Sequence, residues 1–205
     1  MKEYDVYLFD FDGTLFDTGE SLGPVFIHGF NAIGMDCKPE DALEYMHHSL
    51  LEVAEMRGIT KEQWPPFVEA IVKALDFEDS LRLIKLFPET VEVLRALKAK
   101  GKKMGIVSNN TVTHIQLVLK QFGLTDLFEV YSGSDVVAVP KPAADPILYA
   151  LDKFGIEPSH NVVYVGDSLQ DVACGNNAHV DAILIKRDGD SNHKDVISNL
   201  KELLA

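Results

Sequence analysis

The sequence predicts an α/β protein with a mostly parallel sheet, helices on both faces of the sheet, and a small all-helical insertion after the first strand. Two observations predict this class. Short apolar runs, rich in branched and aromatic residues, alternate with longer segments of helical periodicity. One early region interrupts the alternation, because between residues 17 and 85 only helical patterns follow one another.

Four runs predict buried strands: Tyr4–Phe9, Lys103–Ser108, Val162–Gly166 and Ala182–Ile185. Most of their residues are apolar, as expected for strands covered on both faces. The segments between them predict helices that end at a glycine: Glu89–Lys100 before Gly101, Val112–Phe122 before Gly123, and Pro142–Phe154 before Gly155. This order of elements favours a Rossmann-like core domain formed by residues 1–16 and 86–205.

Helical patterning covers residues 17–85 in three stretches, namely Ser21–Ile33, Pro39–Met56 and Lys61–Lys73. No repeat, low-complexity tract or Pro/Ser-rich linker separates this segment from the rest of the chain. We therefore expect residues 17–85 to form a helical cap domain that packs against the core as a lid.

The composition narrows the set of expected partners. Against 32 Asp and Glu stand 19 Lys and Arg, and the formal net charge of −13 repels the phosphates of nucleic acids. Cys37 and Cys174 are far apart in sequence and fit reduced thiols in a cytoplasmic protein. The charged start predicts no signal peptide, and no uncharged run approaches membrane-spanning length. We expect a cytoplasmic protein that binds neither nucleic acid nor membrane, and no feature points to an obligate protein partner.

The most informative polar residues stand where apolar runs stop. Asp10 and Asp12 follow the first predicted strand, Ser108 and Asn109 close the second, and Asp167 follows the third. Ligands of open α/β sheets bind outside the carboxyl ends of the strands, so three separate segments would deliver oxygen atoms to one crevice. Residues two apart in a strand share a face, and both carboxylates of the first segment can therefore enter the crevice.

A cation is expected at this crevice. With Asp171 added, several carboxylates gather there and would raise one another's pKa unless positive charge compensated. Mg²⁺ suits such oxygen ligands, and no His/Cys cluster indicates zinc. The predicted metal ligands are Asp10, Asp12, Asp167 and Asp171.

Lys141, between Pro140 and Pro142, is a candidate for the same crevice because the two prolines restrict its backbone. Its charge suits a phosphate, and the Ser108 hydroxyl with neighbouring N–H groups suits the other phosphate oxygens. Taken singly, an Asp at a strand end is most often a turn or N-cap residue, and a lysine is most often solvated. Together these residues predict a site for a phosphoryl group.

Competing motif interpretations fail mostly on spacing. The stretch Asp10–Ser21 is not a calcium loop, because glycine stands fourth rather than sixth and serine stands twelfth. The common nucleotide-binding loops G-x-x-x-x-G-K-[ST] and G-x-G-x-x-G are absent from the sequence. Gly166–Gln170 misses a G-x-S-x-G nucleophile elbow by one residue, although Asp181 and His193 follow Ser168 in triad order. A serine hydrolase therefore stays open as an alternative.

Four motifs occur in order over most of the chain: Asp10-Phe11-Asp12-Gly13-Thr14, Ser108-Asn109, Lys141-Pro142, and Gly166-Asp167-Ser168 with Asp171. In order and spacing they resemble the motifs of the haloacid dehalogenase-like hydrolase superfamily. With a helical insertion after the first motif, the nearest resemblance is to the phosphoglycolate phosphatase and β-phosphoglucomutase branch.

The resemblance implies residue roles. Asp10 would be the nucleophile that forms an aspartyl-phosphate, and Asp12 would act first as acid and then as base. Mg²⁺ would be held by Asp10, the backbone carbonyl of Asp12 and Asp167, with Asp171 near or in the shell. The implied phosphate-binding residues are Thr14, Ser108, Asn109 and Lys141. His47 and His48 fall where caps of this branch present specificity residues, and the competing interpretation is that they are exposed helix residues without a role.

The implied function is a Mg²⁺-dependent phosphatase acting on a small phosphorylated metabolite such as phosphoglycolate or a sugar phosphate. The carbon–halogen-cleaving members of the family lack the second aspartate, so Asp12 implies phosphoryl transfer. A phosphomutase, a pyrophosphatase or nucleotidase on the same core, and more distantly a phosphorylated receiver domain stay open. Gly175 and His179 stand where the family commonly has alanine and glycine, which puts the local packing in question.

Overall fold

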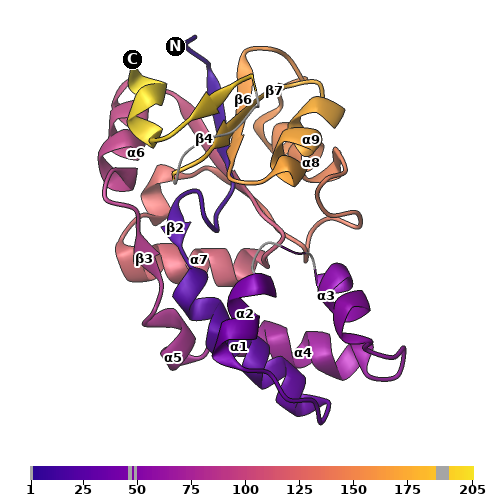
Figure 1. Cartoon of the computed structure of the whole chain (residues 1–205). Helices are drawn as coiled ribbons and strands as arrows, with labels where there is room; N and C mark the ends of the chain where they lie inside the picture. The colour runs from indigo at the N-terminus through magenta and orange to yellow at the C-terminus, as the bar shows by residue number, and fades with distance from the viewer. Residues whose placement is uncertain (1, 46–47, 49, 188–193) are drawn as a thin grey trace. The chain divides into compact units, whose positions relative to one another are not determined.

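The computed structural model describes residues 2–45, 48, 50–187 and 194–205. The chain divides into two compact units, one formed by Met1–Phe16 with Leu86–Ala205 and the other by Asp17–Lys85. The first is the α/β unit and the second is the helical unit (Figure 1).

A six-stranded sheet with the order β5-β4-β1-β6-β7-β8 forms the centre of the α/β unit, and its described pairs are all parallel. The strands are β1 (Val6–Phe9), β4 (Lys103–Val107), β5 (Val130–Ser132), β6 (Val162–Gly166), β7 (Asp181–Ile185) and β8 (Val196–Ile197). Every residue of β1 and β6 is buried, which is why these strands are apolar on both faces.

Helices cover both faces of this sheet. They are α6 (Thr90–Ala99), α7 (Val112–Phe122), α8 (Asp145–Phe154) and α9 (Leu169–Asn177), with short 3₁₀ turns η1 (Thr125–Leu127) and η2 (Leu200–Leu204). Right-handed crossovers place α6 and α7 on one face and α8 and α9 on the other, and Figure 1 shows α6 opposite the α8–α9 pair. On the α8–α9 face, Val6 and Leu8 of β1 belong to one apolar cluster with Ile147 and Leu151 of α8. The predicted α/β fold is confirmed.

The structure explains how Gly175 and His179, the two residues that depart from the common family pattern, fit between α9 and β7. A Cβ on Gly175 would lie 2.8 Å from the Cβ of Ala182, so the glycine allows α9 to approach β7 closely. His179, in the turn between α9 and β7, has a φ of 56°, a left-handed conformation that is uncommon outside glycine. The close packing between α9 and β7 therefore depends on the glycine and on this strained turn.

The helical unit contains α1 (Gly19–Ala32), α2 (Pro39–Tyr45), α3 (Leu50–Arg57), α4 (Trp64–Leu75) and α5 (Glu78–Leu81). Its apolar cluster includes the aromatic rings of Phe26, Phe30 and Phe67. The structure divides the stretch 39–56 between α2 and α3. Helix α4 begins at Trp64 because the prolines that follow lie in its first turn, where the missing proline N–H costs no helical bond.

Strands β2 (Phe16–Asp17) and β3 (Lys85–Leu86) form a separate two-stranded sheet at the two points where the chain passes between the units.

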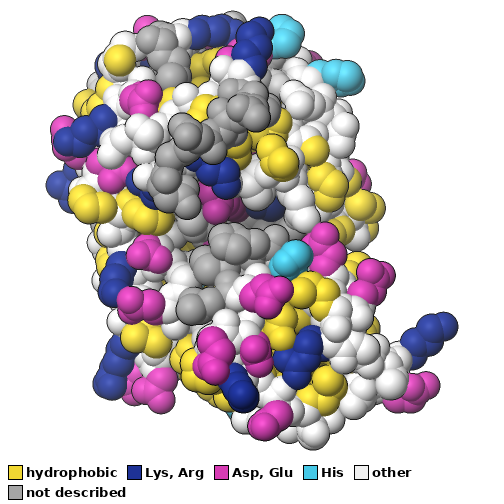
Figure 2. All heavy atoms as spheres, viewed as in Figure 1, with side chains coloured by type: hydrophobic (Ala, Val, Ile, Leu, Met, Phe, Trp, Pro, Cys, Tyr) yellow, Lys and Arg dark blue, Asp and Glu magenta, His cyan; other side chains and the backbone are white. Residues whose placement is uncertain are grey.

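No helix in the described part of the chain is both long and apolar enough to cross a membrane. On the face seen in Figure 2, Lys and Arg side chains are interspersed with acidic ones rather than gathered in a basic patch.

Candidate active site

The candidate active site lies in the α/β unit, at the carboxyl ends of β4, β1 and β6. The order of the strands reverses at β1, since β4 and β5 extend the sheet on one side and β6, β7 and β8 extend it on the other. Open α/β sheets form their ligand crevice at such a reversal. Asp10, Ser108 and Asp167 directly follow these three strands.

A tight turn after β1 presents Asp10 and Asp12. The Asp10 N–H still donates to the carbonyl of Val165 at 2.8 Å, so the nucleophile candidate is fixed to β6. The chain then turns at Gly13, whose φ of 68° is left-handed. A Cβ at this position would lie 2.2 Å from a carboxylate oxygen of Asp167, and glycine is therefore needed for both the turn and the contact.

Lys141 joins two of the carboxylates. Its ammonium lies 2.8 Å from Asp10 and 2.6 Å from Asp171, and the residue is only 8% exposed. Burial by itself lowers the pKa of Lys141, but the two carboxylates raise it above its ordinary value, so the side chain is charged. The Lys141 N–H donates to the side-chain oxygen of Asn109 at 3.2 Å. Both the backbone and the ammonium of this lysine are therefore held.

Asp171 is 1% exposed and accepts hydrogen bonds from several groups. Besides Lys141, the Tyr164 hydroxyl donates to it at 2.9 Å, and the Ser168 N–H and hydroxyl donate at 3.1 and 2.5 Å. Ser168 and Asp171 form a reciprocal capping box at the start of α9. Burial alone raises the pKa of Asp171, but Lys141 and these hydrogen bonds lower it below its ordinary value. Asp171 is therefore ionised and rigidly placed.

Asp10, Asp167 and Asp171 form a carboxylate cluster, with one oxygen atom of each within 4.8 Å of the others. Burial raises the pKa of Asp10 well above its ordinary value. Burial and the charge of Asp171 raise the pKa of Asp167 to about 6. Lys141 opposes both shifts without cancelling them. The negative charge that remains is the charge that a divalent cation offsets, and a cluster of oxygen ligands suits Mg²⁺.

The Asp12 carboxylate is not part of this cluster. Its Oδ2 accepts a hydrogen bond from the Asn110 side-chain amide at 2.6 Å. That bond connects the turn after β1 to the loop after β4. The two carboxylates of the first motif therefore have different hydrogen-bond partners, Lys141 for Asp10 and the Asn110 amide for Asp12, while the charge of Asp12 still contributes to the raised pKa of Asp10.

The predicted phosphate-binding residues also differ in their surroundings. Ser108 is buried, and its hydroxyl accepts from the Asn110 N–H at 3.1 Å. Asn109 is exposed. Thr14 is fully buried, and its hydroxyl has no hydrogen-bond partner within the described chain. Thr111 caps α7, so the two residues after β4 are not used as its N-cap.

The two histidines predicted to contact the substrate belong to the helical unit. His47 lies outside the described residues. His48 is exposed, and its Nδ1 lies 4.0 Å from the Glu52 carboxylate. Their role in specificity stays a prediction.

Sequence reasoning missed two residues that orient the aspartates. The Tyr164 hydroxyl lies 2.9 Å from both Asp171 and the Val107 carbonyl, at the centre of the sheet. An aromatic residue inside an apolar strand is typical of core, so the sequence carries no signal for this role. Asn110, which binds Asp12, did carry a signal in the sequence, because it directly follows Ser108 and Asn109, the strand-end residues predicted to bind phosphate.

Two basic residues after β7 were missed as well. The Lys186 ammonium donates to the backbone carbonyl of Asp167 at 2.9 Å, and the Arg187 guanidinium donates to the carbonyl of Thr14 at 2.8 Å. They directly follow the last predicted strand, so the strand-end argument applied to the first three strands would have found them.

The geometry argues against the serine-hydrolase alternative. Ser168 follows the carboxyl end of β6, whereas Asp181 begins β7 and pairs with Val163. Val163 lies roughly 10 Å of strand before the carboxyl end of β6, and Ser168 lies beyond that end. Asp181 binds Lys2 at 2.9 Å instead, and His193, the third member of the supposed triad, lies outside the described residues.

The chain is similar to known proteins over most of its length. A model of the haloacid dehalogenase-like hydrolase family matches residues 7–185. Pyrophosphatase PpaX of Bacillus velezensis is 31% identical over 178 residues, which cover 86% of this chain and 81% of that protein. A phosphoglycolate phosphatase of Pasteurella multocida is 27% identical over 188 residues, covering 87% and 84%.

Solved structures give the same result. A structure described as a haloacid dehalogenase-like hydrolase from Bacteroides fragilis superposes with a TM-score of 0.87 at 27% identity, covering 98% of this chain and 100% of that one. The predicted family and fold are confirmed, and so is the predicted enzyme class, which is a phosphatase of this family. The chain belongs to the haloacid dehalogenase-like hydrolase family.

Proposed function

We propose that the chain is a Mg²⁺-dependent phosphatase that hydrolyses a small phosphorylated metabolite, such as phosphoglycolate or a sugar phosphate, through an aspartyl-phosphate on Asp10. The observation that carries the proposal is the pair Asp10 and Asp12 at the end of β1, with Lys141 2.8 Å from Asp10. A nucleophile, a second carboxyl group for proton transfer and a nearby cation are what phosphoryl transfer to an aspartate needs.

The chemistry consists of two displacements at phosphorus. A carboxylate oxygen of Asp10 attacks in line, and the bond from phosphorus to the leaving alcohol breaks while the Asp12 carboxylic acid donates its proton to the alcohol oxygen. Asp12, now ionised, takes a proton from a water molecule whose oxygen attacks the same phosphorus. The bond to Asp10 breaks, inorganic phosphate leaves, and Asp12 is protonated again. The amide of Asn110, 2.6 Å away, orients Asp12 for both transfers.

The phosphate is proposed to bind between the ends of β1 and β4. Lys141 uses two of its three ammonium N–H groups for Asp10 and Asp171, which leaves one for a phosphate oxygen. Thr14, Ser108 and Asn109 are the other proposed phosphate-binding residues. Because the Thr14 hydroxyl is fully buried, we assign its contribution to the backbone N–H.

Mg²⁺ is proposed to be held by Asp10, Asp167 and Asp171 together with the backbone carbonyl of Asp12. These residues fit the ion because the clustered donors are oxygen atoms, and because burial first and then the neighbouring carboxylates raise the pKa values of Asp10 and Asp167, which a bound cation would oppose. When bound, Mg²⁺ neutralises part of the phosphate charge that an anionic nucleophile must approach.

Residues 17–85 are proposed to be the cap domain, and residues 1–16 and 86–205 the core domain. The compactness of both units supports this division, and every residue of the proposed chemistry belongs to the core segments. His47 and His48 are the proposed contacts to the leaving group. The expectations of a cytoplasmic location and of no nucleic-acid, membrane or obligate protein partner stay predictions.

Inorganic pyrophosphate is a second candidate substrate, because the relative from Bacillus velezensis that is 31% identical is named a pyrophosphatase. The test is phosphate release from phosphoglycolate, pyrophosphate, sugar phosphates and nucleotides, with Mg²⁺ and with EDTA. We expect Mg²⁺-dependent release that falls by about 1,000-fold or more in Asp10→Asn. Release in EDTA, or release untouched by Asp10→Asn, would exclude the proposed mechanism.

Asp12→Asn separates the two displacements. With p-nitrophenyl phosphate, whose leaving group needs no proton, this variant should still form the aspartyl-phosphate but lacks the base that activates water. The intermediate should therefore accumulate, visible as the added mass of one phosphoryl group on the acid-quenched protein. Asp10→Asn is the matched control, since it has the same size and lacks the nucleophile. Conversion of one sugar phosphate isomer to another without release of phosphate would favour a phosphomutase.

A further inference from the structure

Lys186 and Arg187 lie at the end of β7, and each binds a backbone carbonyl of a different catalytic loop. Lys186 is fixed at its own backbone, because its N–H donates to the carbonyl of Ile197 at 2.8 Å. Its ammonium donates to the carbonyl of Asp167 at 2.9 Å, in the loop that follows β6. Arg187 donates to the carbonyl of Thr14 at 2.8 Å, in the turn that carries Asp12.

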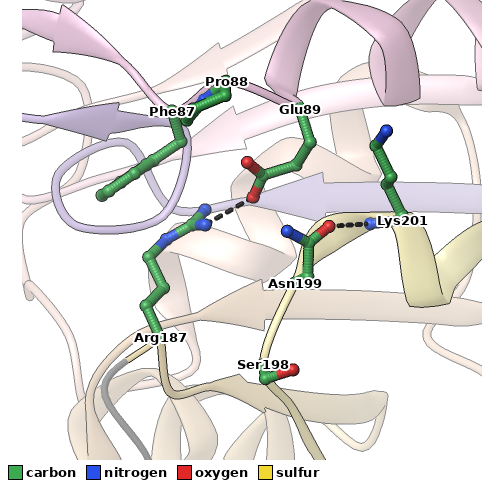
Figure 3. Close-up of a pocket in the computed structure, with 7 residues that line it drawn as sticks. All are labelled: Phe87, Pro88, Glu89, Arg187, Ser198, Asn199 and Lys201. Carbon is green, nitrogen blue, oxygen red and sulfur yellow. Dashed lines mark hydrogen bonds and ion pairs between the residues drawn. The ribbon is translucent and has the colours of Figure 1, made fainter.

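Arg187 is held by more contacts than its bond to Thr14. Its guanidinium stacks on the ring of Phe87 at 3.5 Å and forms an ion pair with Glu89, a carboxylate that is 4% exposed (Figure 3). Its Nε is buried and has no hydrogen-bond partner within the described chain. The guanidinium is therefore fixed in one orientation, with one edge toward the turn after β1.

The pocket beside Arg187 is not a convincing ligand site. It has a volume of about 570 Å³ and is lined by Phe87, Glu89, Arg187 and Lys201 among others (Figure 3). Both of these basic side chains are already paired, Arg187 with Glu89 and Lys201 with Glu92. The contacts of Arg187 thus point inward to the catalytic turn rather than outward to a bound molecule.

The two loops that the pair holds are in contact with each other. A Cβ on Gly13 would lie 2.2 Å from the Asp167 carboxylate, so the turn after β1 and the loop after β6 pack without free space. A shift of either loop changes the position of Asp12 relative to Asp167. Misplacement of a catalytic group by about 1 Å costs on the order of 100-fold in rate.

We propose that Lys186 and Arg187 are positioning residues, which hold the turn after β1 and the loop after β6 at the spacing that phosphoryl transfer requires. This inference rests on the proposed function for its effect on rate. Neither side chain is assigned a contact with substrate, so both act through the two carbonyls that they bind.

The test compares Lys186→Met and Arg187→Met, which keep much of each apolar stem, with Lys201→Met. The control removes a positive charge from the pocket beside Arg187, and Lys201 pairs with Glu92 at 2.7 Å rather than with either loop. With p-nitrophenyl phosphate and Mg²⁺, we expect kcat to fall about 30- to 100-fold in each test variant while KM changes less than about threefold. We expect the control to behave as the unaltered protein.

Conservative variants separate positioning from folding. Lys186→Arg keeps a donor for the Asp167 carbonyl and should recover most of kcat. Arg187→Lys keeps a charge beside Glu89 but lacks the fork that reaches Thr14, so it should stay folded and slow. A fully active Arg187→Lys would overturn the role assigned to Arg187, and an inactive but folded Lys186→Arg would overturn the role assigned to Lys186.

Hydrogen exchange supplies a readout that does not depend on activity. In Lys186→Met the amides of residues 166–170, and in Arg187→Met the amides of residues 11–16, should exchange about tenfold faster or more. In Lys201→Met the exchange rates of both segments should not change. Unchanged exchange, or kcat within about threefold of the control, would overturn the inference. If the unaltered protein releases no phosphate from any compound, the proposed function fails, while exchange still decides whether the pair holds the loops.

Discussion

Gly13→Ala changes both the backbone and the carboxylate contact of the turn after β1. The left-handed φ of 68° makes alanine strained by about 1 kcal/mol. The new Cβ would also lie 2.2 Å from the Asp167 carboxylate, whereas real Cβ atoms keep at least 3.0 Å, so that carboxylate must retreat by about 0.8 Å. A shift of this size in a proposed metal ligand costs on the order of 100-fold in rate, or about 2.7 kcal/mol.

Gly123→Ala is the matched control for this prediction. Gly123 has nearly the same φ of 67°, but a Cβ there would meet nothing within 4 Å. We expect both variants to lose about 2–4 °C in melting temperature from backbone strain. Only Gly13→Ala should lose phosphate release and bind Mg²⁺ more weakly in calorimetric titration. If the two variants release phosphate within about threefold of each other, the argument from the Gly13–Asp167 contact is refuted.

Three further changes test other contacts of the site. Burial alone raises the pKa of Glu89, but its bond to Arg187 lowers it below the ordinary 4.5. Its stabilising contribution is therefore present above about pH 4.5 and lost as the pH falls, and urea unfolding of Glu89→Gln should show a deficit of about 1–2 kcal/mol at pH 7 that closes near pH 3. Tyr164→Phe removes a donor to Asp171 and should cost about 1 kcal/mol of stability with less than a tenfold loss of kcat, so an unchanged melting temperature would speak against that bond. Lys141→Met leaves Asp10 and Asp171 buried without their cation, and we expect undetectable phosphate release and a loss of about 3–5 kcal/mol, which measurable turnover would contradict.

The parts of the fold and site that the sequence predicts are those with a local signal. Strands β1 and β6 are buried on both faces and therefore read as unbroken apolar runs. The edge strands β5 and β8, of three and two residues, are too short for periodicity to appear. The strand-end rule led to Asp10, Ser108 and Asp167, because parallel strands end at one edge of a sheet.

The residues that were not predicted act through tertiary contacts that no local pattern encodes. Tyr164 reads as core, and only the fold shows that its hydroxyl meets Asp171. Lys186 and Arg187 read as a basic turn, yet they bind carbonyls 19 and 173 residues away in sequence.

Strands β2 and β3 pair at the two points where the chain leaves the α/β unit and returns to it. An insertion whose ends are adjacent adds little loop-closure entropy to its host, and this entropic cost rises only slowly as the insertion becomes longer. All the carboxylates of the cluster and Lys141 belong to the host segments. Evolution can therefore exchange residues 17–85 as one block, and protein engineering can graft helical insertions from relatives between Phe16 and Leu86, without rebuilding the carboxylate cluster.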